Sequence, residues 1–207
     1  SRRTTPPFGP MRFENSFLHI HADDEVADFS LSGQTEFVDA RWVKPNHLIA
    51  EWKNNSIKVA PPVVSLLIEV VRCLKNNAGD MNAVALDLEK RMPGRNSILF
   101  AHGVEVVPVP TATLPPADHT NSYLVGDPEG SFILVDAACR TKEAMEDLVA
   151  AVERHQGELV AMMFTHRHSD HLGDIGLLKE TFSVPIWASK ETATAIPCDR
   201  ILVDGEI

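Results

Sequence analysis

The chain has 207 residues, a formal net charge of −10 and three cysteines. Its length fits one large domain or two modest ones, and 44% hydrophobic with 23% charged residues is ordinary for a globular protein. No apolar run approaches the roughly 18 residues that a membrane span needs, so we expect no membrane association. Three scattered cysteines are too few for a disulfide scaffold and favour the cytoplasm or an organelle interior.

The acidity is confined to the second half of the chain. Residues 1–96 contain 12 Lys and Arg against 12 Asp and Glu, whereas residues 97–207 contain 7 against 17, a net charge of −10. This asymmetry predicts two units, with a boundary between about 76 and 97. It also disfavours nonspecific binding of nucleic-acid phosphates by the second half, so a small-molecule substrate is the expected partner.

In the first half, hydrophobic patterning and proline positions predict two strands, an acidic loop and three helices. Prolines mark two helix starts, because a proline in the first turn costs the helix no hydrogen bond. The helix introduced by Pro61-Pro62 is apolar nearly all round, and we expect it to be buried. The predicted strands are 12–21 and 36–43, the acidic loop is 23–25, and the predicted helices are 47–53, 63–74 and 80–91.

In the second half, strands and helices alternate. Thr141 is the predicted N-cap of an amphipathic helix, with Glu143 well placed in its first turn. The run 159–164 is short and wholly apolar, as expected of a buried strand. The predicted strands are 104–109, 121–125, 131–136, 159–164 and 184–188, and the predicted helices are 142–155 and 172–182.

One motif stands apart, directly after the strand at 159–164. Side chains two residues apart in an extended chain project to the same side, so His166 and His168 can converge on one metal ion. The chain must then turn, which directs Asp170 and His171 toward a second nearby position. Imidazoles with a carboxylate suit zinc, and also iron or manganese.

The stretch Thr165 to Asp174 resembles the signature of metallo-β-lactamase-fold hydrolases. Two upstream strands, 121–126 and 133–136, resemble the first core strands of the same fold. The likeness covers about 98–207, the N-terminal half of that fold, and is greatest to the glyoxalase-II-like thioesterases and the lactamase-β-like endoribonucleases. It implies an α+β class, part of an αββα sandwich, and a hydrolase that uses a metal-activated hydroxide on a thioester, ester or phosphodiester.

The resemblance also implies roles for individual residues. His166 and His168 would bind the first metal, and Asp170 and His171 the second, with Asp170 counted as the catalytic residue. Zinc is the expected cofactor, in two positions, with iron or manganese as alternatives. Asp136 would orient the metal-binding loop from behind without binding metal itself.

One departure from the family pattern concerns the remaining ligands. The family supplies a further His, a bridging Asp and a last His from its C-terminal half, whereas no histidine follows His171 here. The chain starts with Ser1, and residues 203–207 are typical of half a hairpin. We therefore expect a fragment, open at both ends, that is a poor enzyme by itself.

Residues 1–76 resemble the C-terminal half of a Nudix fold, an α/β/α architecture. The likeness rests on the ordered segments 12–17, 37–45 and 57–62, with 77–97 as a helical linker to the second domain. The glutamate-rich Nudix box is absent, and no two glutamates are adjacent in residues 1–96. Diphosphate hydrolysis therefore cannot be assigned to any residue of this segment.

Three functional hypotheses follow. The first is a metal-dependent hydrolase of a small molecule. The second is an endoribonuclease of the same fold, and the third is a non-catalytic Nudix-like binding module attached to an inactive metal domain.

Overall fold

The computed structural model describes residues 2–4, 11, 13–21, 33, 40–90 and 97–205. These residues fall into two compact units, one within residues 1–4 and 13–93 and the other formed mainly by residues 94–207. The predicted acidic loop at 23–25 lies outside the described residues. No described helix combines the length and apolar character needed to cross a membrane.

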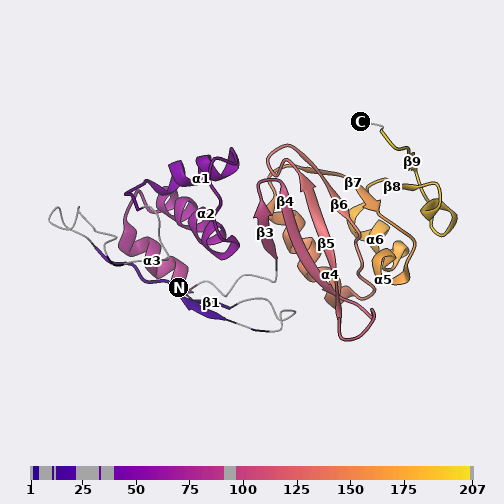
Figure 1. The fold of residues 1–207 in the computed structure, drawn as a ribbon, viewed down its shortest axis with the longest axis horizontal. Helices are drawn as coiled ribbons and strands as arrows, with labels where there is room; N and C mark the ends of the chain where they lie inside the picture. The colour runs from indigo at the N-terminus through magenta and orange to yellow at the C-terminus, as the bar shows by residue number, and fades with distance from the viewer. Residues whose placement is uncertain are drawn as a thin grey trace. The chain divides into compact units, whose positions relative to one another are not determined.

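The first unit contains a two-stranded antiparallel sheet and three helices (Figure 1). Strand β2 is shorter than predicted, since residues 13 and 17–21 lie outside it, and residues 40–43 are not a strand, while 36–39 fall outside the described residues. The three helices lie close to their predicted bounds. The elements are β1 (Arg2–Thr4), β2 (Glu14–Ser16), α1 (Pro45–Lys53), α2 (Pro61–Asn76) and α3 (Met81–Lys90).

Helix α2 is less buried than its composition predicts. Only Val64 and Cys73 of this helix are buried, and Ile68 is exposed. Helix α3 occupies the segment predicted as a linker, yet Val84 and Leu88 pack with Cys73 in a small core. The apolar surface of α2 is therefore covered on the side that α3 occupies. The Nudix-like interpretation of this unit stays a prediction.

The second unit is built on one seven-stranded sheet, in the order β3-β4-β5-β6-β7-β8-β9 (Figure 1). Pairing is antiparallel from β3 to β6 and parallel from β6 to β9. Two edge strands, β3 and β9, were not predicted. The strands are β3 (Ile98–Ala101), β4 (Val104–Pro110), β5 (His119–Gly126), β6 (Ser131–Val135), β7 (Glu158–Phe164), β8 (Ile186–Ser189) and β9 (Arg200–Leu202).

Helices cover one face of this sheet. Helix α4 (Lys142–Arg154) begins at its predicted N-cap, where the Thr141 hydroxyl accepts a hydrogen bond from the Ala144 amide. The single helix predicted at 172–182 is two helices, α5 (Ser169–Leu172) and α6 (Ile175–Phe182), because Gly173 takes a positive φ and Asp174 caps α6. A short 3-10 helix, η2 (Thr192–Thr194), precedes β9.

The core lies between the sheet and these helices. Alternate side chains of the strands point to one face, as the two-residue period of a strand requires. Burying this much apolar surface is the main term that favours folding. The core includes Val107, Leu124, Phe132, Leu134, Met162 and Ile186 from the strands, and Met145, Leu148 and Leu178 from α4 and α6.

Candidate metal centre

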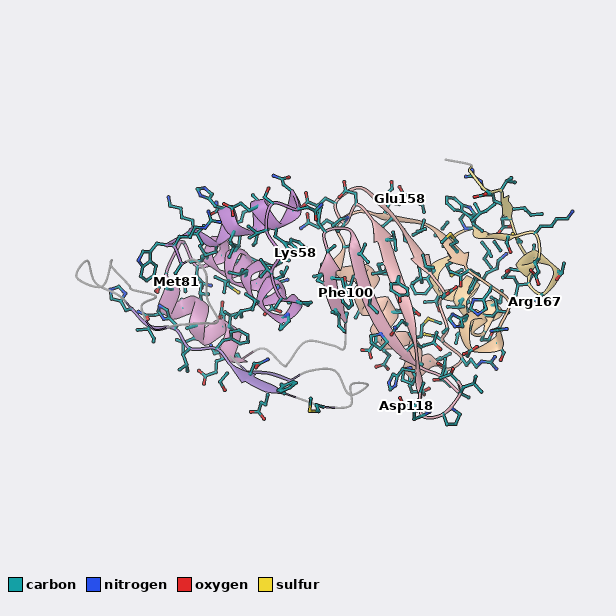
Figure 2. All side chains as sticks on the ribbon, viewed as in Figure 1. Lys58, Met81, Phe100, Asp118, Glu158 and Arg167 are labelled. Atoms are coloured by element: carbon teal, nitrogen blue, oxygen red, sulfur yellow. The ribbon has the colours of Figure 1, made fainter. Side chains whose placement is uncertain are left out.

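The site lies where β6 and β7 end. These neighbouring strands are parallel, so their carboxyl ends share one edge of the sheet, the edge at which open α/β sheets usually bind ligands. Strand β5 is antiparallel to β6, so the loop 111–118 before β5 lies at the same edge. Figure 2 places Asp118 of that loop at the opposite end of the sheet from Glu158, where β7 begins.

Asp136 is the first residue after β6 and is buried, with 4% of its surface exposed. Its φ of 50° is in the left-handed region, which Asp tolerates better than most residues. The backbone is fixed on both sides: the Asp136 amide donates to the Met163 carbonyl over 2.9 Å, and the Ser122 hydroxyl donates to the Asp136 carbonyl over 2.6 Å. The carboxylate is thereby directed at the residues that follow β7.

Two histidine side chains lie beside this carboxylate. Each of Asp136, His166 and His171 offers a ligand atom, and these atoms all lie within 4.8 Å of one another. The Nδ1 atom of His171 lies 3.0 Å from Oδ2 of Asp136, and the rings of His166 and His171 are 4.2 Å apart between centroids. Two imidazoles and a carboxylate form a donor set that suits zinc.

Thr165 connects these groups. Its hydroxyl donates to Asp136 Oδ2 over 2.6 Å and lies 2.9 Å from Nδ1 of His166. A hydroxyl has one proton, so the Thr165 oxygen can only accept from His166, whose Nδ1 must then carry the proton. The Asp136 carboxylate likewise accepts from Nδ1 of His171. A neutral imidazole that carries its proton on Nδ1 presents Nε2 as an acceptor, the form in which imidazole binds a metal.

His168 and Asp170 lie beside the cluster but outside the three-residue set. The ring of His168 is exposed and lies edge-on to His166 at 4.6 Å between centroids. Asp170, in α5, accepts a hydrogen bond from the Thr113 hydroxyl over 2.6 Å. This bond is the main reason that the pKa of Asp170 is lowered, with burial opposing it and His171 and His168 adding to it. The predicted two-metal assignment of these four residues stays a prediction.

The segment 137–140 and the junction between α5 and α6 pack against each other beside the site. A Cβ on Gly173 would lie 2.5 Å from the carbonyl oxygens of both Ala137 and Cys139, so only glycine allows this approach. The Asp174 amide donates to the Cys139 carbonyl over 2.7 Å, and Arg140 donates to the carbonyl of Ser169 over 2.6 Å. Residues 137–140, after β6, are thus joined to both ends of α5.

Sequence reasoning missed several residues of this arrangement. Thr113 lies 57 positions before Asp170, and no local pattern connects them. Ser122 lies in a predicted strand, and no local pattern distinguishes it from the other strand residues. Thr165 directly precedes the His-rich turn, and a hydroxyl at that position is a sequence signal for a residue that holds the first histidine.

Residues 115–197 match the family model of the Metallo-beta-lactamase superfamily. The chain is 30% identical over 95 residues to a protein of Bdellovibrio bacteriovorus named hydroxyacylglutathione hydrolase, covering 43% of this chain and 38% of the relative. It is 31% identical over 70 residues to exodeoxyribonuclease WalJ of Streptococcus pneumoniae, covering 34% of this chain and 26% of the relative.

Among solved structures, a beta-lactamase domain protein from Burkholderia ambifaria matches with a TM-score of 0.43 and 17% identity, over 57% of this chain and 46% of that one. The family match supports the predicted metallo-β-lactamase superfamily fold for the second unit. The chain spans well under half of the length of both curated relatives. The match to the family model does not extend to residues 1–114.

Proposed function

We propose that residues 97–205 carry the metal-binding part of a hydrolase active site of the metallo-β-lactamase type. One observation carries this proposal: Asp136, His166 and His171 bring their ligand atoms within 4.8 Å of one another at the sheet edge formed by β6 and β7. A matching family model over residues 115–197 supports it.

Within this proposal, His166 and His171 present Nε2 to the metal, while Asp136 and Thr165 hold their Nδ1 protons and fix both ring orientations. His168 and Asp170 complete the donor set on the exposed side. Bound zinc supplies polarisation of the scissile bond and activates water near neutral pH. Iron or manganese would fit the same nitrogen and oxygen donors.

For the substrate we propose a small thioester. A relative is named hydroxyacylglutathione hydrolase, and a hydroxyacylglutathione is a thioester. Another relative is named exodeoxyribonuclease, which makes a phosphodiester the competing candidate. The net charge of −10 in residues 97–207 favours the thioester, because binding along a nucleic-acid backbone needs clustered Lys and Arg.

Metal binding is the first test. The chain is stripped with a chelator and titrated with zinc by calorimetry, as wild type and as the double variant His166→Ala/His171→Ala. The matched control is His19→Ala/His21→Ala, which also removes two histidines. Both are exposed, and they have the two-residue spacing of His166 and His168 without the rest of the motif. We expect the site variant to lose zinc binding and the control to retain it. Equal binding by all three proteins would refute the proposed site.

Activity is the second test. The zinc-loaded chain is incubated with a hydroxyacylglutathione, and thiol release is followed; single-stranded DNA and RNA oligonucleotides are tested in parallel. We expect zinc-dependent thiol release that the site variant lacks. Zinc-dependent cleavage of either oligonucleotide, without thiol release, would replace the thioester by a phosphodiester as the substrate.

A further inference from the structure

The loop at 111–118 contacts the candidate metal centre through one side chain. Thr113 donates its hydroxyl proton to Oδ2 of Asp170 over 2.6 Å. Both side chains are partly buried. The bond joins the loop between β4 and β5 to helix α5, two segments that otherwise reach the sheet edge from different directions.

The loop is itself held in place. The Thr111 amide donates to the Asp118 carbonyl over 3.0 Å, and the Ala117 amide donates to the Leu114 carbonyl over 3.1 Å. The Thr111 hydroxyl donates to the hydroxyl of Thr120, in β5, over 2.8 Å. The two bonds of Thr111 close the loop where it leaves the sheet, and the bond from Ala117 to Leu114 closes a turn within it. The loop that carries Thr113 is therefore held at its base and within its turn.

The geometry has a direct consequence for Asp170. A carboxylate on a four-residue helix can rotate about two side-chain bonds, and ordering it costs conformational entropy. A hydrogen bond to one oxygen removes most of this freedom in advance and leaves the other oxygen, Oδ1, for a cation. Partners of this kind behind a metal ligand commonly change metal affinity by roughly 10- to 100-fold.

We propose that Thr113 is a positioning residue that orients Asp170 for the second metal position. The inference rests on the proposed function, because it gives Asp170 a metal to bind. Thr113 itself contacts neither metal nor substrate in this proposal. Its role is to place one carboxylate oxygen, so that the loop 111–118 and the metal centre are energetically coupled.

The test compares three variants of the full chain by zinc calorimetry and by the visible spectrum of the cobalt-substituted protein. Thr113→Val keeps the side-chain shape but removes the donor, and Thr113→Ser keeps the donor. Thr181→Val is the matched control, because this exposed threonine donates to the Leu177 carbonyl within α6 and not to the site or the loop. Thermal unfolding of the metal-free proteins shows whether each variant folds as wild type does.

We expect Thr113→Val to weaken zinc binding at the position that Asp170 serves about 10-fold or more and to alter the cobalt spectrum, while the metal-free variant still unfolds cooperatively. Thr113→Ser and Thr181→Val should bind within about 3-fold of wild type, because both keep a hydroxyl donor to Asp170. If wild type binds zinc, whether one ion or two, and Thr113→Val binds it equally well, the inference fails while the proposed function stands. If wild type binds no zinc, both fail.

Discussion

Thr165 donates hydrogen bonds to both carboxylate oxygens of Asp136. Its backbone amide donates to Oδ1 over 2.8 Å, and its hydroxyl donates to Oδ2 over 2.6 Å. The two residues are 29 positions apart and follow adjacent parallel strands. Both oxygens of a buried carboxylate thus accept from one residue at the end of the neighbouring strand, which fixes the direction in which the chain leaves β7.

Replacing Thr165 tests this relationship. Thr165→Val removes one donor from a carboxylate that is only 4% exposed, so we expect the metal-free chain to lose about 1–3 kcal/mol of unfolding free energy. Thr165→Ser keeps the hydroxyl and should lie within about 1 kcal/mol of wild type. Urea unfolding measures both. A valine variant as stable as the serine variant would show that the amide bond alone is sufficient.

Gly173 provides a second prediction. Its φ of 64° and ψ of −155° are adopted almost only by glycine, and an added Cβ would lie 2.5 Å from two carbonyl oxygens. We expect Gly173→Ala to cost at least about 2 kcal/mol of unfolding free energy. Gly176→Ala is the control, because the closest contact of its Cβ is a side-chain oxygen at 3.3 Å, and in a helix Ala is favoured over Gly. Equal losses at both positions would contradict the packing argument.

Arg154 gives a third prediction, at the other end of the sheet. It donates to Glu105 over 2.5 Å, and Glu105 is 5% exposed on the face of β4 that α4 covers. Arg154→Met leaves this carboxylate buried, with Nε2 of the His155 ring 3.9 Å from Oε2 of Glu105. We expect a loss of about 2 kcal/mol, below the usual cost of breaking a fully buried pair, because Arg154 is itself partly exposed.

The control for Arg154 is Lys179→Met, which removes a pair between side chains that are both exposed at 40% or more. Such surface pairs contribute about 0–1 kcal/mol. Denaturant unfolding of the two variants, in the same buffer, should therefore separate them clearly. A Lys179 variant that is destabilised as much as the Arg154 variant would show that charge balance, and not burial, sets the cost.

Cys139 predicts how stability changes at alkaline pH. Burial, with a smaller contribution from Asp147, raises the pKa of this thiol to about 12. The folded state therefore keeps its proton where the unfolded state, with a thiol pKa near 9, loses it. The stabilising contribution is present below pH 9 and is lost as pH rises from about 9 toward 12, by up to about 1.4 kcal/mol per pH unit.

Urea unfolding at pH 8 and pH 10 measures this effect, with Cys139→Ala as the comparison. We expect the free energy of unfolding of wild type to fall more between these values than that of the alanine variant. The difference between the two slopes isolates the contribution of the Cys139 thiol from that of every other titrating group. Parallel slopes would show that Cys139 is already ionised, or exposed, in the folded chain.

Much of the second unit could be predicted from the sequence because local signals agree there. The apolar run at 159–164 ends two residues before His166, and that short spacing alone places the histidine at a sheet edge. Edge strand β9 has three residues and no alternation to detect. The left-handed backbone of Asp136 and the Thr113–Asp170 bond depend on contacts between distant segments, which no local period encodes.

The first unit shows the opposite case. Residues 40–43 include Trp42 and Val43, which favour strands, yet they form none. Strand preference reflects how well a side chain fits a pleated, half-buried surface, whereas Trp42 is 65% exposed, so composition alone does not produce a strand here. Pro45 then starts α1 directly, as a proline in the first turn predicts.

Hydrogen bonds connect His166 through Thr165 to Asp136, and Asp136 to His171. They separate the orientation of the ring nitrogens from the character of the exposed surface around them. One buried carboxylate determines which nitrogen of each ring is available, and it does so from inside the sheet edge. Arg167, by contrast, is exposed and pairs with Glu191 outside this set of bonds. In the proposed hydrolase, a substitution at such an exposed position would change the surface around the site while the donor atoms keep their identity, so substrate preference and metal binding could vary separately.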